Sequence, residues 1–337
     1  MTKVLNQVNG KDWTLYQGDC IEIAKGLPDN SIDYSIFSPP FASLYTYSNN
    51  ERDMGNCVND KEFLKNIEYL APELYRAIKP GRLVSFHCMD IPAMKERDGF
   101  IGLKDFPGDL LRIFQKAGFI YHSKVMIWKD PLTEATRTKA LGLMHKQIVK
   151  DSAMCRQGLP DYLITVRKPG NNENPIAHPT GFMDYIGTDS INAPKKVATL
   201  KSKDTVNNHN SHIQIDDPIF SHQVWRKYAS SVWVDIDQSN TLNRESARDS
   251  KDERHICPLQ LDVIARALTL WSNENDIVFS PFAGIGSEIY QAVKMNRKGI
   301  GIELKESYFN QAVKNMQSVE QAKNQISLFD KAGDVNE

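Results

Sequence analysis

Apolar and polar positions alternate between two periods along this chain, and the alternation predicts strands and helices in turn. Runs with strand character lie at residues 13–17, 31–37, 82–87, 119–128 and 162–166. Helical spacing of apolar side chains covers residues 63–78, before the breaker Lys79-Pro80-Gly81, and again residues 106–117. Strands that alternate with helices are typical of an α/β domain.

The pattern changes between residues 169 and 252, which are rich in Asn, His, Pro and Gly and show little periodicity. We interpret this stretch as an inserted, loop-rich module. Regular structure returns after it, with a helix predicted at residues 258–271 and a strand at 277–279. A glycine turn at 280–286, a helix at 287–295 and a strand at 299–302 follow. A final helix, roughly residues 306–322, precedes a short polar tail.

The glycine turn has the layout of a cofactor site. Gly284 and Gly286 follow an apolar strand at the mouth of a helix, where a ligand can approach the backbone. Glu303 comes seventeen residues after Gly286, at the end of the next strand, where a carboxylate can accept both hydroxyls of a ribose. The order predicts an adenosine-containing cofactor, although a tight turn beside a surface glutamate is the plain alternative. The third glycine of the dinucleotide fingerprint is absent, which argues against a nicotinamide-dependent oxidoreductase.

A second candidate loop, Ser38-Pro39-Pro40-Phe41, follows the strand at residues 31–37. Two consecutive prolines fix φ and remove two backbone donors, so the neighbouring carbonyls are held rigidly. The Ser38 hydroxyl and the Pro39 carbonyl can accept hydrogen bonds from an exocyclic amino group, while Phe41 can stack on a ring. The loop therefore predicts a nucleobase site, and by itself it fits equally a strand-ending turn with a core phenylalanine.

Composition narrows the class of protein. With 41 basic and 42 acidic residues among 337, the formal charge of −1 argues against a surface that is basic throughout. Five cysteines without C-x-x-C spacing, and histidines at irregular spacing, predict neither disulfides nor a metal site. No apolar run approaches the roughly 18 residues that span a bilayer, and no signal peptide is evident, so we expect a cytoplasmic protein.

Taken together, the two loops resemble those of the S-adenosylmethionine-dependent DNA amino-methyltransferases, which methylate cytosine N4 or adenine N6. The match has a first block, with Gly18-Asp19, Leu27-Pro28-Asp29 and the Ser38 loop, and a second block over residues 255–260, 280–287 and 301–304. The Ser38 loop precedes the glycine turn, which is the order of the β-class of these enzymes. The resemblance implies a Rossmann-like methyltransferase fold: a circularly permuted mixed sheet with helices on both faces and an inserted loop-rich target-recognition region. The strand at residues 13–17 is then expected to complete the sheet.

The resemblance also implies a division of the chain and a set of roles. We expect the catalytic core at residues 1–168 and 253–322, the target-recognition insertion at 169–252 and a flexible tail at 323–337. The expected catalytic residues are Ser38, Pro39, Pro40 and Phe41. The expected S-adenosylmethionine contacts are Asp19, Ser280, Phe282, Gly284, Gly286, Ser287 and Glu303. Ser280 stands where the family usually has aspartate, which puts the contact to the methionine amino group in doubt.

The implied substrate is duplex DNA with a flipped base, because the amino group cannot be reached inside a helix. Serine before the two prolines favours cytosine N4, with adenine N6 as the alternative. Residues 121–170 carry nine basic and four acidic side chains, and we expect phosphate contacts from Lys124, Lys129, Arg137 and Lys139. Asn, Gln and Arg side chains of the insertion are suited to read base edges. The expected setting is restriction-modification.

Other interpretations stay open. Methylation at cytosine C5 would need a cysteine directly after a proline, but Phe41 follows Pro40 and Cys257 precedes Pro258. An RNA or protein amino-methyltransferase, or a catalytically silent DNA-binding protein, would share much of the sequence pattern. Near the end of the chain, a short stretch resembles the peptide by which bacterial replication and repair proteins bind the sliding clamp, or it packs the final helix on the sheet. That stretch is Gln325, Ile326, Ser327, Leu328 and Phe329.

Overall fold

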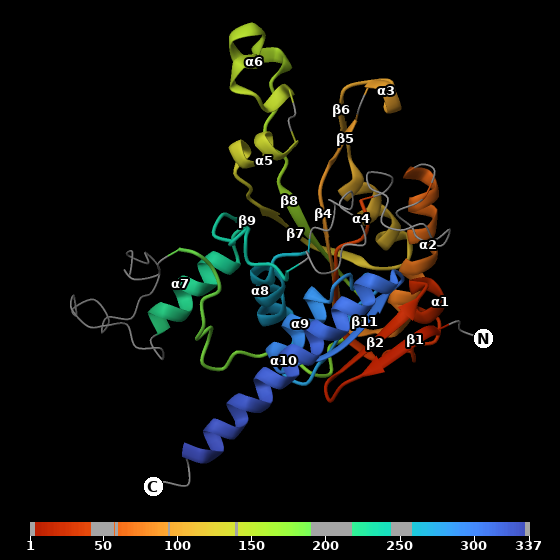
Figure 1. Cartoon of the computed structure of the whole chain (residues 1–337), viewed down its shortest axis with the longest axis vertical. Helices are drawn as coiled ribbons and strands as arrows, with labels where there is room; N and C mark the ends of the chain where they lie inside the picture. Colours follow the sequence, from red (N-terminus) through yellow and green to blue (C-terminus); the bar gives the residue numbers. More distant parts are fainter. Residues whose placement is uncertain are drawn as a thin grey trace, which may run out of the picture.

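The computed structural model describes residues 4–41, 57, 60–93, 95–138, 141–189, 218–243 and 258–333. Within these residues a nine-stranded mixed sheet has the order β1-β2-β11-β10-β3-β4-β8-β7-β9 (Figure 1). Its strands are β1 (Val4–Asn9), β2 (Trp13–Gly18), β3 (Ile32–Phe37), β4 (Ile78–Cys88), β7 (Ile120–Ile127), β8 (Asp161–Arg167), β9 (Val232–Trp233), β10 (Ile277–Ser280) and β11 (Lys298–Glu303). The strands predicted from the sequence are confirmed, and β1 and β9 are additional.

The centre of the sheet is parallel. Strands β2, β11, β10, β3 and β4 pair in parallel, whereas β8 runs antiparallel to both β4 and β7. The early strand β2 completes the sheet beside β11, in the position expected for residues 13–17. Because neighbouring parallel strands end at the same edge, the loops after β2, β3, β10 and β11 all open at one carboxyl edge.

Helices cover both faces of the sheet (Figure 1). They are α1 (Cys20–Ala24), α2 (Asp60–Ala77), α4 (Phe106–Lys116), α8 (Leu261–Trp271), α9 (Ser287–Lys294) and α10 (Glu306–Gly333). On β4, Val84 and Phe86 pack in one core cluster with α2 and α4, while Leu83 packs in another with α8. Successive strand residues point to opposite faces, so this division gives three layers, helices–sheet–helices.

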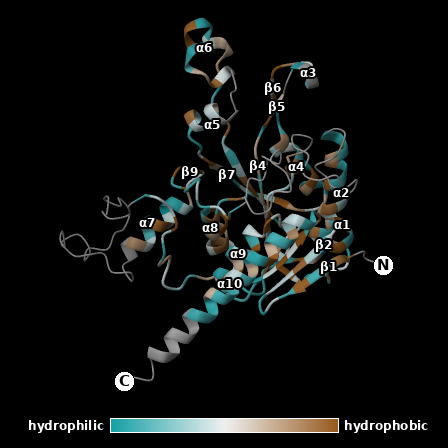
Figure 2. Cartoon of the chain, in the orientation of Figure 1, coloured by the Kyte–Doolittle hydropathy of each residue, from teal (hydrophilic) through white to brown (hydrophobic). Residues whose placement is uncertain are grey.

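Two projections extend from the sheet at its carboxyl edge and stand at the top of Figure 1. One contains β5 (Ile91–Ala93), α3 (Lys95–Asp98) and β6 (Gly102–Lys104), and the other contains α5 (Pro131–Thr138) and α6 (His145–Lys150) between β7 and β8. Neither was predicted, because several of their apolar side chains are exposed and show no regular period. Hydrophobic segments on both are visible in Figure 2, and Ile101 and Val149 are 73% and 83% exposed.

Two regions differ from the sequence-based expectation. The stretch predicted to be loop-rich contains α7 (Pro218–Tyr228) and the strand β9, which joins the sheet beside β7 because its Trp233 side chain is fully buried. The final helix was expected to end near Ala322, yet α10 continues to Gly333. No proline or glycine interrupts residues 306–332, so nothing in the sequence breaks the helix there.

None of the helices in the described part of the chain is both long and apolar enough to cross a membrane.

Candidate active site at the carboxyl edge of the sheet

The loops singled out in the sequence come together at one edge. Asp19 follows β2, Ser38 follows β3, Ser280 ends β10 and Glu303 ends β11, and these four strands are neighbours in the sheet. Phe37, directly before Ser38, lies with its ring centroid 5.7 Å from that of Phe282 in the glycine turn. The two loops, about 240 residues apart in sequence, therefore form one continuous site.

The glycine turn presents its backbone to open space. Gly284 has φ +54°, and a Cβ placed there would meet no atom within 4 Å. Gly286, with φ +90°, precedes the first residue of α9, and a Cβ there would lie 3.3 Å from the Cβ of Ala312 on α10. Left-handed backbone suits glycine at both positions. The turn thus packs closely on α10 at Gly286 and leaves room for a ligand at Gly284.

Glu303 is held directly against this turn. Its Oε2 accepts a hydrogen bond of 2.8 Å from the Gly284 amide, and its Oε1 accepts one of 2.8 Å from the Lys305 amide. A carboxylate fixed by two backbone donors keeps its remaining lone pairs in a defined direction. The acid and the glycine turn predicted to act together are therefore in contact.

Asp19 has a structural contact in addition to its predicted role. Its Oδ1 accepts hydrogen bonds from the Ile21 and Glu22 amides, at 2.9 and 3.0 Å, and so caps the N-terminus of α1. The next residue, Cys20, is buried, and this burial followed by the charges of Asp19 and Glu303 raises the pKa of its thiol well above the usual value. Both carboxylates therefore act on the same small volume at the strand ends.

Two buried polar residues lie behind the turn. The Ser280 side chain is fully buried, and its Oγ has no hydrogen-bond partner among the residues that the structure describes. Glu288, in the first turn of α9, is 3% exposed; burial first, and repulsion by Glu303 second, raise the pKa of its carboxyl to about 8. Glu288 is thus neutral near pH 7. It was not predicted, because an acid in the first turn of a helix is typical of an ordinary dipole partner.

On the other side of the site, Ser38 begins a chain of polar contacts. Its Oγ lies 3.1 Å from Nδ1 of His87, and Nε2 of His87 lies 3.1 Å from Oδ2 of Asp161. The second contact has ion-pair distance without the alignment of a hydrogen bond. Lys129 binds the other oxygen of Asp161. The antiparallel pairing of β4 with β8 brings His87, near the end of one strand, beside Asp161 at the start of the other.

The charge on Asp161 sets the protonation of this chain. Burial opposes ionisation, but His87 and then Lys129 more than offset it and lower the pKa of Asp161 to about 2. A carboxylate facing Nε2 favours the proton on that nitrogen. Nδ1 is then free to accept the hydrogen bond from the Ser38 hydroxyl. His87 and Asp161 were not singled out in the sequence; the available signal was a polar residue at each end of an apolar strand.

Phe41 completes this side of the site. It is half-buried, with its ring centroid 6.1 Å from that of His87 and 6.4 Å, edge-on, from that of Phe106. The aromatic side chain predicted to stack on a base therefore lies next to the Ser38–His87 pair, at the place where the amino-binding acceptors are expected.

The predicted phosphate contacts have a different outcome. Lys129 is engaged by Asp161, and its side chain is only 17% exposed, so it supports the active site rather than facing solvent. Lys124 lies with Nζ 3.9 Å from the centre of the Tyr162 ring. The Arg137 side chain and Lys139 fall outside the described residues. Of the two that the structure describes, Lys129 is paired with a carboxylate, whereas Lys124 is exposed beside an aromatic ring.

The cysteines and metal-binding residue types add little chemistry. Burial, as the largest cause, raises the pKa of the Cys88 thiol well above its usual value, as it does for Cys20, so neither is suited to act as a thiolate. Cys257 lies outside the described residues. Within the described ranges, no group of three or more His, Cys, Asp or Glu side chains is arranged to hold a metal ion.

A family model described as DNA methylase, for N6 and N4 methyltransferases, matches residues 32–314. Among curated proteins, the chain is 23% identical over 304 residues to the Type II methyltransferase M.BglII of Bacillus subtilis, covering 87% of this chain and 66% of the relative. It is 24% identical over 294 residues to the orphan methyltransferase M.BamHII of Bacillus amyloliquefaciens, covering 86% and 92%. The chain spans only 26% of a further relative, the Type II beta methyltransferase M.BslI of a Bacillus strain.

Solved structures agree on the fold. TTHA0409 from Thermus thermophilus, solved with S-adenosyl-L-methionine, superposes with a TM-score of 0.56 at 17% identity, covering 90% of this chain and 95% of that one. The cytosine-N4-specific PvuII DNA methyltransferase superposes with a TM-score of 0.56 at 14% identity, covering 96% of both chains. The mixed sheet with helices on both faces is therefore the fold of DNA methyltransferase structures.

Proposed function

This chain belongs to the DNA methylase family of N6 and N4 methyltransferases, and on that basis we propose that it transfers a methyl group from S-adenosylmethionine to the exocyclic amino group of a flipped base in duplex DNA. Cytosine N4 is the favoured acceptor and adenine N6 the alternative. The observation that carries the proposal is the meeting of the Ser38 loop and the glycine turn at one sheet edge, through Phe37 and Phe282.

The residues of the glycine turn fit S-adenosylmethionine. Open space at Gly284 admits a ligand against the backbone, and Glu303 beside it suits the ribose hydroxyls. Asp19 would bind the adenine, while Phe282, Gly286 and Ser287 shape the pocket. When bound, the cofactor supplies a methyl group activated by its positively charged sulfur.

Ser280 departs from the family's usual aspartate, but its environment still suits a polar ligand. Its buried Oγ lacks a partner in the described chain, so a donor such as an ammonium group would satisfy it. The neutral carboxyl of Glu288 lies in the same part of the structure, at the start of the following helix, and would ionise more readily beside a bound cation. The missing aspartate is therefore compatible with cofactor binding.

The Ser38 loop would orient the acceptor. With the proton of His87 on Nε2, the Ser38 hydroxyl would donate to Nδ1, 3.1 Å away, and its oxygen lone pairs would be left to accept a hydrogen bond from the amino group. The Pro39 carbonyl would accept the second. Holding both N–H bonds in this way reduces the conjugation of the nitrogen lone pair with the ring and aims it at the methyl group. Phe41 would stack on the base.

The same contacts offer a path for the proton that must leave. As the N–C bond forms and the S–C bond breaks, the nitrogen becomes positively charged and gives one proton to the Ser38 oxygen. The Ser38 proton passes to Nδ1 of His87, and the resulting imidazolium faces the Asp161 carboxylate. The electron pair of the S–C bond stays on sulfur, so the charges balance.

DNA recognition would come from residues 169–252 and from basic side chains near the site. The described part of that region is attached to the core by Arg266, whose Nη1 donates to Asp235 at 3.0 Å and whose guanidinium lies between the Tyr228 and Trp233 rings. Such anchoring would hold a recognition element in a fixed position beside the sheet. Lys124, Arg137 and Lys139 remain the proposed phosphate contacts, and restriction-modification remains the proposed setting.

The test is transfer of labelled methyl from S-adenosylmethionine to duplex DNA, RNA and protein, followed by mass spectrometry of the nucleosides. We expect label in N4-methylcytosine or N6-methyladenine, lost in Phe41→Ala and retained in Tyr69→Ala, which removes an exposed aromatic on α2. Label in RNA or protein but not in DNA would reject the proposed acceptor.

The sliding-clamp peptide is a separate proposal. Residues Gln325 to Phe329 lie within α10. Truncation after Asn324 should abolish binding to a purified bacterial clamp without altering methyl transfer to short duplexes. Unchanged clamp binding would remove the proposal.

A further inference from the structure

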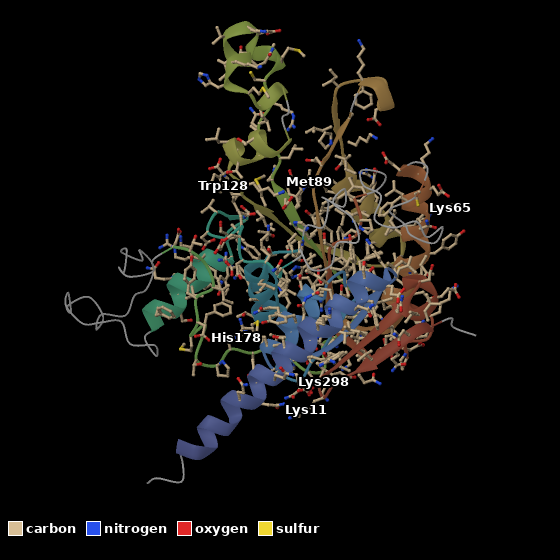
Figure 3. The ribbon with its side chains drawn as sticks, in the orientation of Figure 1. Lys11, Lys65, Met89, Trp128, His178 and Lys298 are labelled. Atoms are coloured by element: carbon tan, nitrogen blue, oxygen red, sulfur yellow. The ribbon has the colours of Figure 1, made fainter. Side chains whose placement is uncertain are left out.

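Apart from the candidate active site, a cavity of about 550 Å³ lies between α8, α9 and residues 178–186. His178 in its wall lies far from Met89 and Trp128, which mark the bases of the two projections (Figure 3). The cavity shares no lining residue with the Ser38 loop or the glycine turn. Its volume falls in the range of roughly 300–1,000 Å³ that is typical of small-molecule sites.

The wall formed by residues 178–186 is held in place by hydrogen bonds. The Phe182 amide donates to Ser221 Oγ at 2.8 Å, and the Ile186 amide donates to the Tyr228 hydroxyl at 2.9 Å. The buried Arg266 donates to the Ile186 carbonyl. The middle and one end of the wall are thereby tied to α7 and α8, so the cavity is preformed.

One buried polar group in the cavity is unsatisfied. Gln291, on α9, is 7% exposed, and its Oε1 has no hydrogen-bond partner in the described part of the chain. A buried acceptor without a donor destabilises the folded state. A ligand that brings an N–H group into the cavity would remove that penalty.

The rest of the lining selects against charge. Phe182, Met183 and Met295 supply an aromatic ring and two thioethers. The Asp262 carboxylate is already bound by the Asp237 amide at 3.0 Å and by Asn240 Nδ2 at 2.6 Å. Burial lowers the pKa of His178, so its imidazole is neutral at pH 7.

The charged side chains of Lys294 and Asp184 are exposed, at the rim, and have opposite signs. They therefore favour neither an anion nor a cation inside. The interior combines aromatic and thioether groups with the polar side chains of Asn240, Thr269 and Gln291. It suits a flat, neutral molecule that carries a hydrogen-bond donor.

We infer that this cavity is a second ligand site, which binds a neutral aromatic heterocycle of the nucleobase class through an amino group that donates to Gln291 Oε1. The ring lies among Phe182, Met183 and Met295. This site is distinct from the cofactor pocket and from the flipped-base site, and it does not depend on the proposed methyl transfer.

The experiment compares adenine with purine, which lacks the amino group, by calorimetric titration of the full chain. S-adenosylhomocysteine at saturating concentration fills the cofactor pocket, and a Phe41→Ala background disables the flipped-base site. We expect adenine to bind about tenfold more tightly than purine, which is about 1.4 kcal/mol. Gln291→Leu should abolish this preference, whereas Gln317→Leu, an exposed glutamine on α10, should retain it.

A second variant keeps the test independent of one substitution. Phe182→Ala should weaken adenine and purine alike, by about fivefold or more, and leave their ratio unchanged. The inference is overturned if adenine does not bind in the Phe41→Ala background, if Gln291→Leu leaves the preference intact, or if Phe182→Ala binds both ligands normally.

Discussion

The two halves of the candidate active site treat their polar groups differently. Around Ser38, each polar side chain already faces another, from Ser38 through His87 to Asp161 and Lys129. Around the glycine turn, a buried hydroxyl at Ser280 has no partner in the described chain, Gly284 faces open space, and Glu288 is a buried carboxyl held neutral.

This difference indicates how the work is divided. Polar side chains that face one another within the protein are pre-organised, because each of them positions its neighbour. Polar groups without a partner carry a cost that a ligand can remove. We therefore expect the Ser38 half to determine the rate of transfer and the fold's stability, and the glycine half to determine cofactor affinity.

The largest effect should come from filling the open space at the glycine turn. Gly284→Asp would place a carboxylate in the space next to the turn, and we expect cofactor affinity to fall by about 1,000-fold, or about 4 kcal/mol. Gly99→Asp is the matched control, because Gly99 also has a positive φ, +80°, and open space around its Cβ position. Calorimetric binding of S-adenosylhomocysteine measures both; equal affinity in the two variants would contradict the assignment of the pocket.

Removing a charge from the contacts around Ser38 should instead reduce the stability of the fold. Asp161→Asn leaves Lys129 mostly buried without its carboxylate, and we expect a loss of about 3 kcal/mol in the free energy of unfolding. Asp109→Asn, which removes an exposed partner of Arg112, should leave the free energy of unfolding almost unchanged. Urea unfolding measures both variants.

The pH dependence of this loss of stability follows from the direction in which the pKa of Asp161 is shifted. Since the folded state lowers the pKa of Asp161 to about 2, its stabilisation is fully present above its ordinary value near 3.8 and is lost as the pH falls through 2. The gap between wild type and Asp161→Asn should therefore be constant from about pH 5 to 8 and narrow below about pH 4. A difference that does not narrow below about pH 4 would contradict the lowered pKa of Asp161.

The two sides of the candidate active site also differ in how much of each could be predicted from the sequence. The glycine turn and Glu303 were predicted because they are local: strand, turn, helix and acid follow one another in about 27 residues. The Ser38 loop was predicted for the same reason, from a rigid tetrapeptide after an apolar strand. The alternating pattern likewise predicted the central strands to within a few residues.

His87 and Asp161 could not be predicted, since their meeting depends on the antiparallel pairing of β4 with β8 across 74 residues. Lys129 was assigned to DNA because a lysine in a basic stretch carries no sign in the sequence of a buried partner. The helical projection between β7 and β8 was missed because most of its apolar residues are exposed. Glu288 was missed because burial, not residue type, makes it unusual.

A smaller effect, on the rate of methyl transfer alone, should follow from removing the Ser38 hydroxyl. Ser38→Ala removes the acceptor proposed for the amino group and the link to His87, and we expect kcat to fall about 100-fold while cofactor affinity is unchanged. Ser31→Ala, a hydroxyl bound to the Pro28 carbonyl in the preceding turn, should leave kcat unchanged. Single-turnover methylation measures the rate; a change confined to KM would mean that Ser38 only binds the base.

The smallest effect should appear in the glycine half without ligand, as a pH-dependent stability. Because the pKa of Glu288 is raised to about 8, its neutral form is favoured in the folded state, and that stabilisation is present below about pH 4.5 and lost as the pH rises through 8. Glu288→Gln cannot ionise, so relative to wild type it should gain about 2 kcal/mol between about pH 5 and pH 6.5.

Thermal unfolding of Glu288→Gln across this pH range checks the difference, and Glu68→Gln, on the surface beside Lys116, should show no such gain. The cofactor's charge gives a sharper comparison, because S-adenosylhomocysteine lacks the positively charged sulfur that S-adenosylmethionine carries. If the two ligands change the pH dependence of stability that is due to Glu288 equally, then Glu288 does not respond to that charge. The residues around the glycine turn would then select the cofactor by its shape alone.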